Sequence, residues 1–173
     1  MEAVYRTERF TIVKKPKQVG GVVVLREYIS LPPAAAVLAL RGDSVVFVRQ
    51  LRGALGRWTL EIPAGAVEPG ESPEEAAARE LAEETGYRPL RLQFLLDFYP
   101  SPGVSDELIK IYFTDNVERA AAPVRDLGEV GMEVVEMSIK EAFELIDRGV
   151  ITDGKTVAAL LYAERRGLLP RLV

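Results

Sequence analysis

The sequence contains neither cysteine nor histidine. Without cysteine, the chain has no disulfide, no thiolate nucleophile and no cysteine-based zinc site. Without histidine, any acid–base chemistry falls to Glu, Asp, Lys, Arg, Tyr or a metal-bound water. The two absences leave carboxylates, cationic side chains and metal ions as the candidates for catalysis.

Long apolar runs and long basic runs are also missing. No stretch approaches the roughly 18 apolar residues of a membrane span, and "MEAVYRTERF" lacks the layout of a signal peptide. The net charge is −4, which does not favour nucleic acid as the main partner. With 173 residues, 48% of them hydrophobic and 28% charged, we expect a single domain over residues 1–173. We also expect a cytoplasmic protein with neither a membrane nor a nucleic acid as its partner.

The hydrophobic pattern predicts strands before and after one central helix, with two more helices late in the chain. Strand-like runs occur in "RFTIV", "GGVVVLREYI", "AAAVLAL", "SVVFVRQL", "RWTLEI", "LRLQFLLDFY", "LIKIYFT" and "EVVEMS". Helical spacing occurs in "IKEAFELIDRG" and "GKTVAALLYAERRG". This order predicts an α/β or α+β sandwich with antiparallel strands at the N-terminus.

The central helix has clear start and stop signals. Ser72 and Glu75 form the pattern of a capping box, and Pro73 suits the first helical position. Gly86 is the expected C-terminal stop. These signals predict a helix from about Pro73 to Thr85.

The same segment, "GAVEPGESPEEAAARELAEETGY" at residues 65–87, is crowded with glutamates. Glu80 and Glu84 are four residues apart and share one helix face, with Glu83 beside them in the last turns, where the helix dipole disfavours carboxylates. A solvated acidic face is one interpretation. The other is a site for Mg²⁺ or Mn²⁺, which prefer hard oxygen ligands. In either case Arg79 is placed to pair with one of these carboxylates and fix its direction.

The glutamate spacing decides between the two interpretations. It runs Gly65, five residues, Glu71, seven residues, Arg79-Glu80-Leu81, one residue, Glu83-Glu84, one residue, Gly86-Tyr87. This arrangement resembles, position by position, the signature of the Nudix hydrolases, which use divalent metals to cleave a diphosphate linked to another moiety. The resemblance implies an α/β/α sandwich around a mixed β-sheet, with the motif forming a loop, a helix and a second loop.

The resemblance also implies roles for individual residues. Glu80 and Glu84 correspond to principal metal ligands, Glu83 lies alongside them and Glu71 is more peripheral. The carbonyl of Ala64 is a further expected ligand. Gly65 and Gly70 are interpreted as tight-turn positions that tolerate positive φ.

The flanking segments "LEIPAG" and "SPGVSDE" resemble the ADP-ribose pyrophosphatase branch of this family, and Pro102 stands fifteen residues beyond Tyr87. This resemblance implies hydrolysis of ADP-ribose to AMP and ribose 5-phosphate by a homodimer, with residues 1–40 involved in dimerisation. The residues expected at the substrate are Arg52, Glu107, Pro102 and Gly103, together with Arg26 and Glu27 from the neighbouring subunit. An ordinary Pro-Gly turn and a surface arginine are the alternatives for Pro102-Gly103 and Arg52.

The catalytic base is the least defined role. In this branch a glutamate on a loop after the motif often accepts the proton from water, and Glu129 in "VRDLGEVGMEVVEMS" is the candidate, with Glu83 as the alternative. Other substrates stay open, namely NADH, a diadenosine polyphosphate or a nucleoside triphosphate. A Nudix-fold sensor that binds a nucleotide without cleaving it is the alternative from a different functional class.

Overall fold

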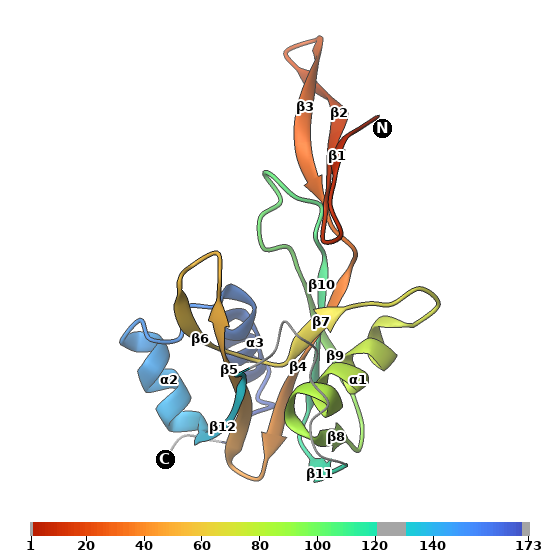
Figure 1. Ribbon diagram of the computed structural model, residues 1–173. Coiled ribbons are helices and arrows are strands. Elements are labelled where there is room, and N and C mark those ends of the chain that lie inside the picture. The colour runs from red at the N-terminus through yellow and green to blue at the C-terminus, as the bar shows by residue number, and fades with distance from the viewer. Residues whose placement is uncertain (1, 121–130, 171–173) are drawn as a thin grey trace.

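The structure, a computed structural model, describes residues 2–120 and 131–170 (Figure 1). Its strands are β1 (Glu2–Arg6), β2 (Thr11–Val19), β3 (Val22–Ser30), β4 (Ala34–Arg41), β5 (Ser44–Arg52), β6 (Arg57–Glu61), β7 (Ala64–Ala66), β8 (Tyr87–Pro89), β9 (Gln93–Phe98), β10 (Ile109–Thr114), β11 (Val117–Arg119) and β12 (Glu133–Ser138). Its helices are α1 (Pro73–Thr85), α2 (Ile139–Asp147) and α3 (Gly154–Arg165). None of the helices in the described ranges is long and apolar enough to cross a membrane.

The central sheet has mixed strand directions. Its order is β12-β5-β4-β10-β9, with β6 paired to β5 and β7 paired to β4. Strands β4 and β10 are parallel, and the other pairs in this sheet are antiparallel. Strand β4 lies in the middle, and its residues 35–40 are buried, which is expected of a strand covered on both faces.

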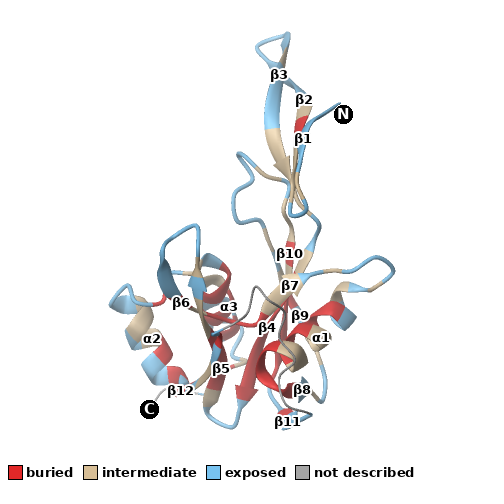
Figure 2. Cartoon of the chain, viewed as in Figure 1, coloured by how far each residue is buried: buried red, intermediate tan, exposed pale blue. Residues whose placement is uncertain are grey.

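Helices cover both faces of this sheet, so the predicted α/β/α sandwich is confirmed (Figure 1). Side chains alternate along β4: Val37 packs in the same cluster as Leu81 of α1, whereas Leu38 packs in the cluster that contains Leu160 of α3. Figure 2 shows buried residues on β4 and β5 and on the helices α1 and α3. The two apolar clusters fix α1 against the sheet, and α1 carries the acidic motif.

The predicted helix boundaries agree with α1. Ser72 accepts a hydrogen bond from the backbone N–H of Glu75, and the Glu75 carboxylate accepts one from the Ser72 N–H at 2.8 Å. Gly86 ends the helix in the left-handed region with φ of 75°. Local capping signals were therefore sufficient to place this element.

The first three strands form a separate antiparallel sheet that stands out from the sandwich (Figure 1). Strands β2 and β3 are joined at Gly20 and Gly21, both with positive φ. The sequence predicted strands here, but not β1. It also did not predict β7, β8 and β11, because segments of three residues carry little periodic signal.

Candidate active site

The site begins with two buried carboxylates in the second half of α1. Glu80 is 7% exposed and Glu84 is 2% exposed. The backbone N–H of Ala64 donates to Oε2 of Glu84 at 3.1 Å, because β7 lies against α1 while pairing with β4. Burying a carboxylate is costly unless other groups compensate its charge. The C-terminal half of α1 therefore needs positively charged groups next to Glu80 and Glu84.

Arg79 provides part of that compensation. Its Nε and Nη2 donate to the two oxygens of Glu71 at 2.9 and 3.1 Å. Its Nη1 donates to Glu80 at 2.7 Å and to Glu83 at 2.9 Å, and its Nη2 also donates to the carbonyl of Ala66 at 3.0 Å. The hydrogen bonds that Arg79 donates to Glu71 lower the pKa of Glu71 and raise the pKa of Arg79 despite partial burial. Arg79 was expected to orient one carboxylate and instead contacts three.

Gly65 corrects an expectation. The sequence suggested tight turns at Gly65 and Gly70, and Gly70 has φ of +88°, but Gly65 does not have positive φ. It lies in β7, and a Cβ built on it would overlap the carboxylate of Glu80. Glycine is required at residue 65 for close approach rather than for a turn.

The donor set at the α1 end fits a divalent cation. The two buried carboxylates present hard oxygens four residues apart on one face, and the missing side chain of Gly65 makes room for the carboxylate of Glu80. In the described ranges, no group of three Asp or Glu residues is already gathered as metal ligands. Three of the four glutamates, Glu71, Glu80 and Glu83, are hydrogen-bonded to Arg79. Glu80 and Glu84 with Ala64 are the residues that would hold the cation.

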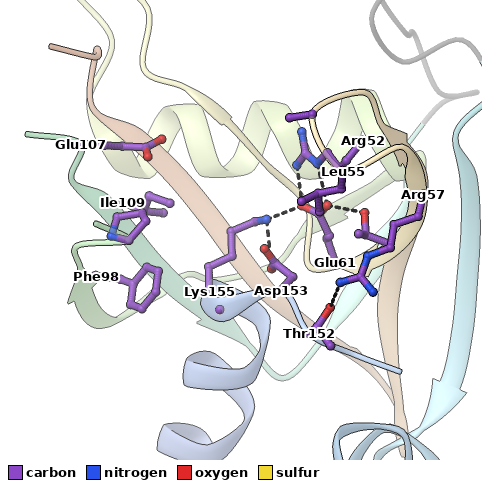
Figure 3. A pocket seen from close by; sticks show the side chains of 14 residues that line it. Arg52, Leu55, Arg57, Glu61, Phe98, Glu107, Ile109, Thr152, Asp153 and Lys155 are labelled. Carbon is purple, nitrogen blue, oxygen red and sulfur yellow. Dashed lines mark hydrogen bonds and ion pairs between the residues drawn. The ribbon is translucent and has the colours of Figure 1, made fainter. Parts of the chain in front are cut away.

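A second charged cluster lies around Glu61 (Figure 3). Glu61, at the end of β6, is 2% exposed and accepts two hydrogen bonds from Arg52, at 2.6 and 2.5 Å. It also accepts from Thr59 at 2.6 Å and from the ammonium group of Lys155. Lys155 pairs in addition with Asp153 at 3.0 Å. Burial alone would raise the pKa of Glu61, but Arg52, Lys155 and Thr59 outweigh it and lower that pKa to about 2.

Two cavities meet at this cluster. One, of about 570 Å³, extends towards Leu55, Arg57 and Phe98. The other, of about 610 Å³, reaches β7 at residues 64–66 and the N-terminal residues 8–10. The residues shared by both linings are Arg52, Glu107, Ile109 and Lys155. We call these four shared residues the junction. The second cavity therefore connects the junction to β7, the strand beside the carboxylates of α1.

Glu107 is the acidic member of this junction. Burial raises its pKa, and the nearby charges of Lys155 and Arg52 oppose that shift. Glu107 lines both cavities, and its expected location near the substrate stays a prediction. Arg52, the other residue expected there, is held by Glu61 rather than free on the surface.

Four of the remaining predicted residues line neither cavity, and the fifth is not described. Pro102 and Gly103 are exposed in the loop between β9 and β10 and belong to neither lining. Arg26 and Glu27 are exposed on β3, in the sheet that stands out from the sandwich, so one chain does not bring them to the junction (Figure 2). Glu129 lies outside the described residues.

Asp106 connects the projecting sheet to the loop that leads to Glu107. Its carboxylate accepts hydrogen bonds from Lys15 at 2.8 Å, from the Ser30 hydroxyl at 3.0 Å and from the Leu31 N–H at 3.1 Å. Burial would raise the pKa of Asp106, but the bonds from Lys15, Leu31 and Ser30 lower it. The N-terminal sheet is thus attached to the segment that carries a residue of the junction.

Sequence reasoning missed Glu61, Lys155 and Asp153. Glu61 stands inside the quoted "LEIPAG", which was the available signal for it. Asp153 caps α3 by accepting from the Thr156 N–H, and an Asp-Gly pair before a helical pattern indicates such a cap. No local pattern shows that Lys155 meets Glu61, because the two residues are separated by 94 positions.

Comparisons with known proteins show what this chain is similar to. The model of the NUDIX domain family matches residues 30–160. An ADP-ribose pyrophosphatase of Bacillus subtilis (strain 168) is 37% identical over 152 residues, which cover 87% of this chain and 82% of the relative. A GDP-mannose pyrophosphatase of Cronobacter sakazakii is 35% identical over 158 residues, which cover 83% and 80%. A solved structure described as an ADP compounds hydrolase superposes with a TM-score of 0.82 at 22% identity, covering 96% of this chain and 92% of that one.

Proposed function

This chain belongs to the NUDIX domain family and is a pyrophosphatase of that family, and we propose that it hydrolyses ADP-ribose to AMP and ribose 5-phosphate. The observation that carries the choice of substrate is the junction of two cavities at Arg52 and Lys155. A substrate with two bulky ends joined by a diphosphate suits two cavities that meet at cationic side chains. The relative that acts on ADP-ribose supports the same choice.

The proposed cofactor is Mg²⁺ or Mn²⁺. Glu80, Glu84 and the carbonyl of Ala64 would hold it, with Glu83 alongside and Glu71 at the periphery. A bound divalent cation neutralises diphosphate charge and lowers the pKa of a coordinated water. Arg79 keeps Glu71, Glu80 and Glu83 in fixed directions through the hydrogen bonds described above.

The side chains of the junction would bind and orient the diphosphate. Arg52 has five N–H donors, and the two that contact Glu61 fix the plane of the guanidinium. A fixed guanidinium favours one orientation of a phosphate and so reduces the entropy that the reaction must overcome. In the reaction the oxygen of water forms a bond to phosphorus, and the bond from that phosphorus to the bridging oxygen breaks.

A carboxylate must accept the proton that water releases. Glu129 is the base that we propose, and Glu83 is the alternative among the described residues. One oxygen of Glu83 already accepts a hydrogen bond from Arg79 at 2.9 Å. A carboxylate has further lone pairs on both oxygens, so Glu83 can still accept a proton and stays the alternative.

We further propose that the active species is a homodimer formed through the N-terminal sheet. The exposed large apolar residues of that sheet are Val4, Tyr5, Val19, Val22, Val23 and Leu25. Such a group on one projecting element is typical of an interaction surface, and a two-fold interface is the usual solution for identical chains. In this arrangement Arg26 and Glu27 would reach the substrate bound by the partner subunit. Pro102 and Gly103 would lie at the edge of a bound substrate.

A second substrate has a specific observation in its favour. The GDP-mannose pyrophosphatase relative is 35% identical and covers 83% of this chain, close to the 37% and 87% of the ADP-ribose pyrophosphatase relative. GDP-mannose also has a diphosphate between a nucleoside and a sugar, so it would place the same groups at the junction of the two cavities.

The test is a substrate panel at equal concentration with Mg²⁺ or Mn²⁺ present. It compares ADP-ribose, GDP-mannose, NADH, a diadenosine polyphosphate and nucleoside triphosphates, with products separated by chromatography. We expect the highest kcat/KM for ADP-ribose, with AMP and ribose 5-phosphate as products. If ADP-ribose ranks at background while another compound is cleaved well, the substrate assignment is wrong although the family assignment stands.

A further inference from the structure

Each oxygen of the Glu61 carboxylate accepts two hydrogen bonds, one from Arg52 and one from another residue. Oε1 accepts from Arg52 Nε and from the Thr59 hydroxyl, each at 2.6 Å. Oε2 accepts from Arg52 Nη2 and from the Lys155 ammonium group. Arg52 therefore forms a bidentate pair with the carboxylate, while Thr59 and Lys155 donate to it from other directions.

Lys155 is an unusual member of this group because its charge is buried. Its side chain is 8% exposed, compared with 40% for the side chain of Arg52. It lies in the first turn of α3, where Asp153 caps the helix and pairs with the same ammonium group (Figure 3). A lysine is rarely buried unless it is paired, and here α3 delivers it between two carboxylates.

We infer that Lys155 is a positioning residue for substrate binding, acting through Glu61 to fix the guanidinium of Arg52 at the junction of the two cavities. This inference rests on the proposed function, in which Arg52 binds the diphosphate. Among the described residues, the Nη1 group of Arg52 makes no hydrogen bond to the protein, so it is available to an oxygen of a ligand. Fixing Glu61 fixes the direction of that group.

A purely electrostatic role is the competing explanation. Arg52 and Lys155 carry two positive charges and Glu61 and Asp153 carry two negative charges, so the cluster is neutral. Removing Lys155 makes it more negative, and removing the charge of Glu61 makes it more positive. If charge alone mattered, Lys155→Met would weaken binding of an anionic ligand and Glu61→Gln would strengthen it. If positioning matters, both changes weaken binding.

The experiment measures the affinity of the purified full chain for ADP-ribose and, separately, for inorganic pyrophosphate. Calorimetric titrations are run in a chelator so that neither ligand turns over. We expect Lys155→Met and Glu61→Gln each to raise the Kd by roughly tenfold, as expected for a disturbed hydrogen bond to a charged group. Lys155→Arg, which keeps the charge and can still pair with Glu61, should recover most of the affinity.

Two further variants separate positioning from loss of folding. Lys110→Met removes a lysine that pairs with Asp97 at 2.8 Å outside both cavities, and it should bind like the wild type. In an Arg52→Ala background, Lys155→Met should have almost no additional effect, because the residue on which it acts is gone. Circular dichroism and the melting temperature of each variant establish that folded proteins are compared.

Each outcome is decisive. Tighter pyrophosphate binding by Glu61→Gln, or an effect of Lys155→Met that persists without Arg52, overturns the inference. If Lys155→Met does not fold, Glu61→Gln still gives opposite expectations for the two explanations, namely weaker binding for positioning and tighter binding for charge alone. If pyrophosphate binding shows the expected pattern and ADP-ribose does not bind, the inference stands and the proposed substrate is wrong. If the wild type binds neither ligand, the junction is not an anion site and the inference is wrong.

Discussion

The carboxylate of Glu80 occupies the space that a β-carbon on residue 65 would need. Gly65 belongs to β7 and Glu80 to α1, so their contact sets how closely the strand approaches the helix. Because Glu80 is buried and also bonded to Arg79, its carboxylate has little room to move. The first glycine of the motif is thus coupled to the position of a proposed metal ligand.

We expect Gly65→Ala to displace Glu80 and lower kcat/KM by about a hundredfold, because misplacing a catalytic group by about 1 Å has effects of that size. The overlap should also reduce the free energy of unfolding by about 1–3 kcal/mol. Steady-state kinetics and denaturant unfolding measure the two effects. Gly53→Ala is the matched control, since a Cβ there meets no atom within 4 Å. Normal turnover by Gly65→Ala would contradict the proposed role of Glu80.

Glu84→Gln tests the metal site at the end of α1. The amide is a weaker ligand for a hard cation, so we expect kcat to fall by at least about a hundredfold at saturating Mg²⁺. Stability without metal should hold or rise, because a neutral side chain replaces a buried charge that the helix dipole disfavours. Glu74→Gln, at an exposed position in the first turn of α1, is the control. Near-normal turnover by Glu84→Gln would show that this end of the helix does not hold the metal.

How far the sequence predicted the structure depends on how local each feature is. The boundaries of α1 depend on Ser72, Glu75 and Gly86, which act within one or two turns, and they were predicted correctly. The reason for Gly65 was not, because it requires knowing that β7 passes beside Glu80. The Glu61–Lys155 contact joins β6 to α3 across 94 residues, and no periodicity reports such a pairing. The fold brings these distant charges together, and only the tertiary structure shows it.

The ionised state of Glu61 should contribute to stability in a defined pH range. Its pKa is about 2 in the folded chain, against an ordinary value of 4.5. The unfolded chain therefore binds the proton more readily, and stability rises with pH between about 2 and 4.5 and is fully gained above that range. The shift corresponds to about 3 kcal/mol at neutral pH.

Glu61→Gln removes this contribution, so the difference in unfolding free energy between the two proteins should shrink as the pH falls from 4.5 towards 2. Chemical unfolding monitored by circular dichroism at several pH values gives that difference. Other carboxylates with lowered pKa, such as Asp106 and Glu136, titrate in both proteins and cancel in the comparison. A difference that stays constant across the range would show that Glu61 is not held ionised by Arg52 and Lys155.

The oligomeric state tests the projecting N-terminal sheet. We expect sedimentation at micromolar concentration to give twice the chain mass of 19.1 kDa, and Leu25→Asp to give a monomer. Leu25 is 60% exposed on β3, and a charge at an apolar interface centre opposes association. Leu90→Asp is the matched control, because Leu90 is 57% exposed but lies outside this sheet.

The activity of these variants then decides whether the partner contributes to the site. If Arg26 and Glu27 reach the partner's substrate, Leu25→Asp should raise KM as the dimer dissociates, and raising the protein concentration should restore it. Arg26→Ala should raise KM in the intact dimer without changing its mass. A wild-type protein that sediments as a monomer, or a monomeric variant with unchanged KM, would remove both residues from the site, leaving Arg52, Glu107 and Lys155 to bind the substrate within one chain.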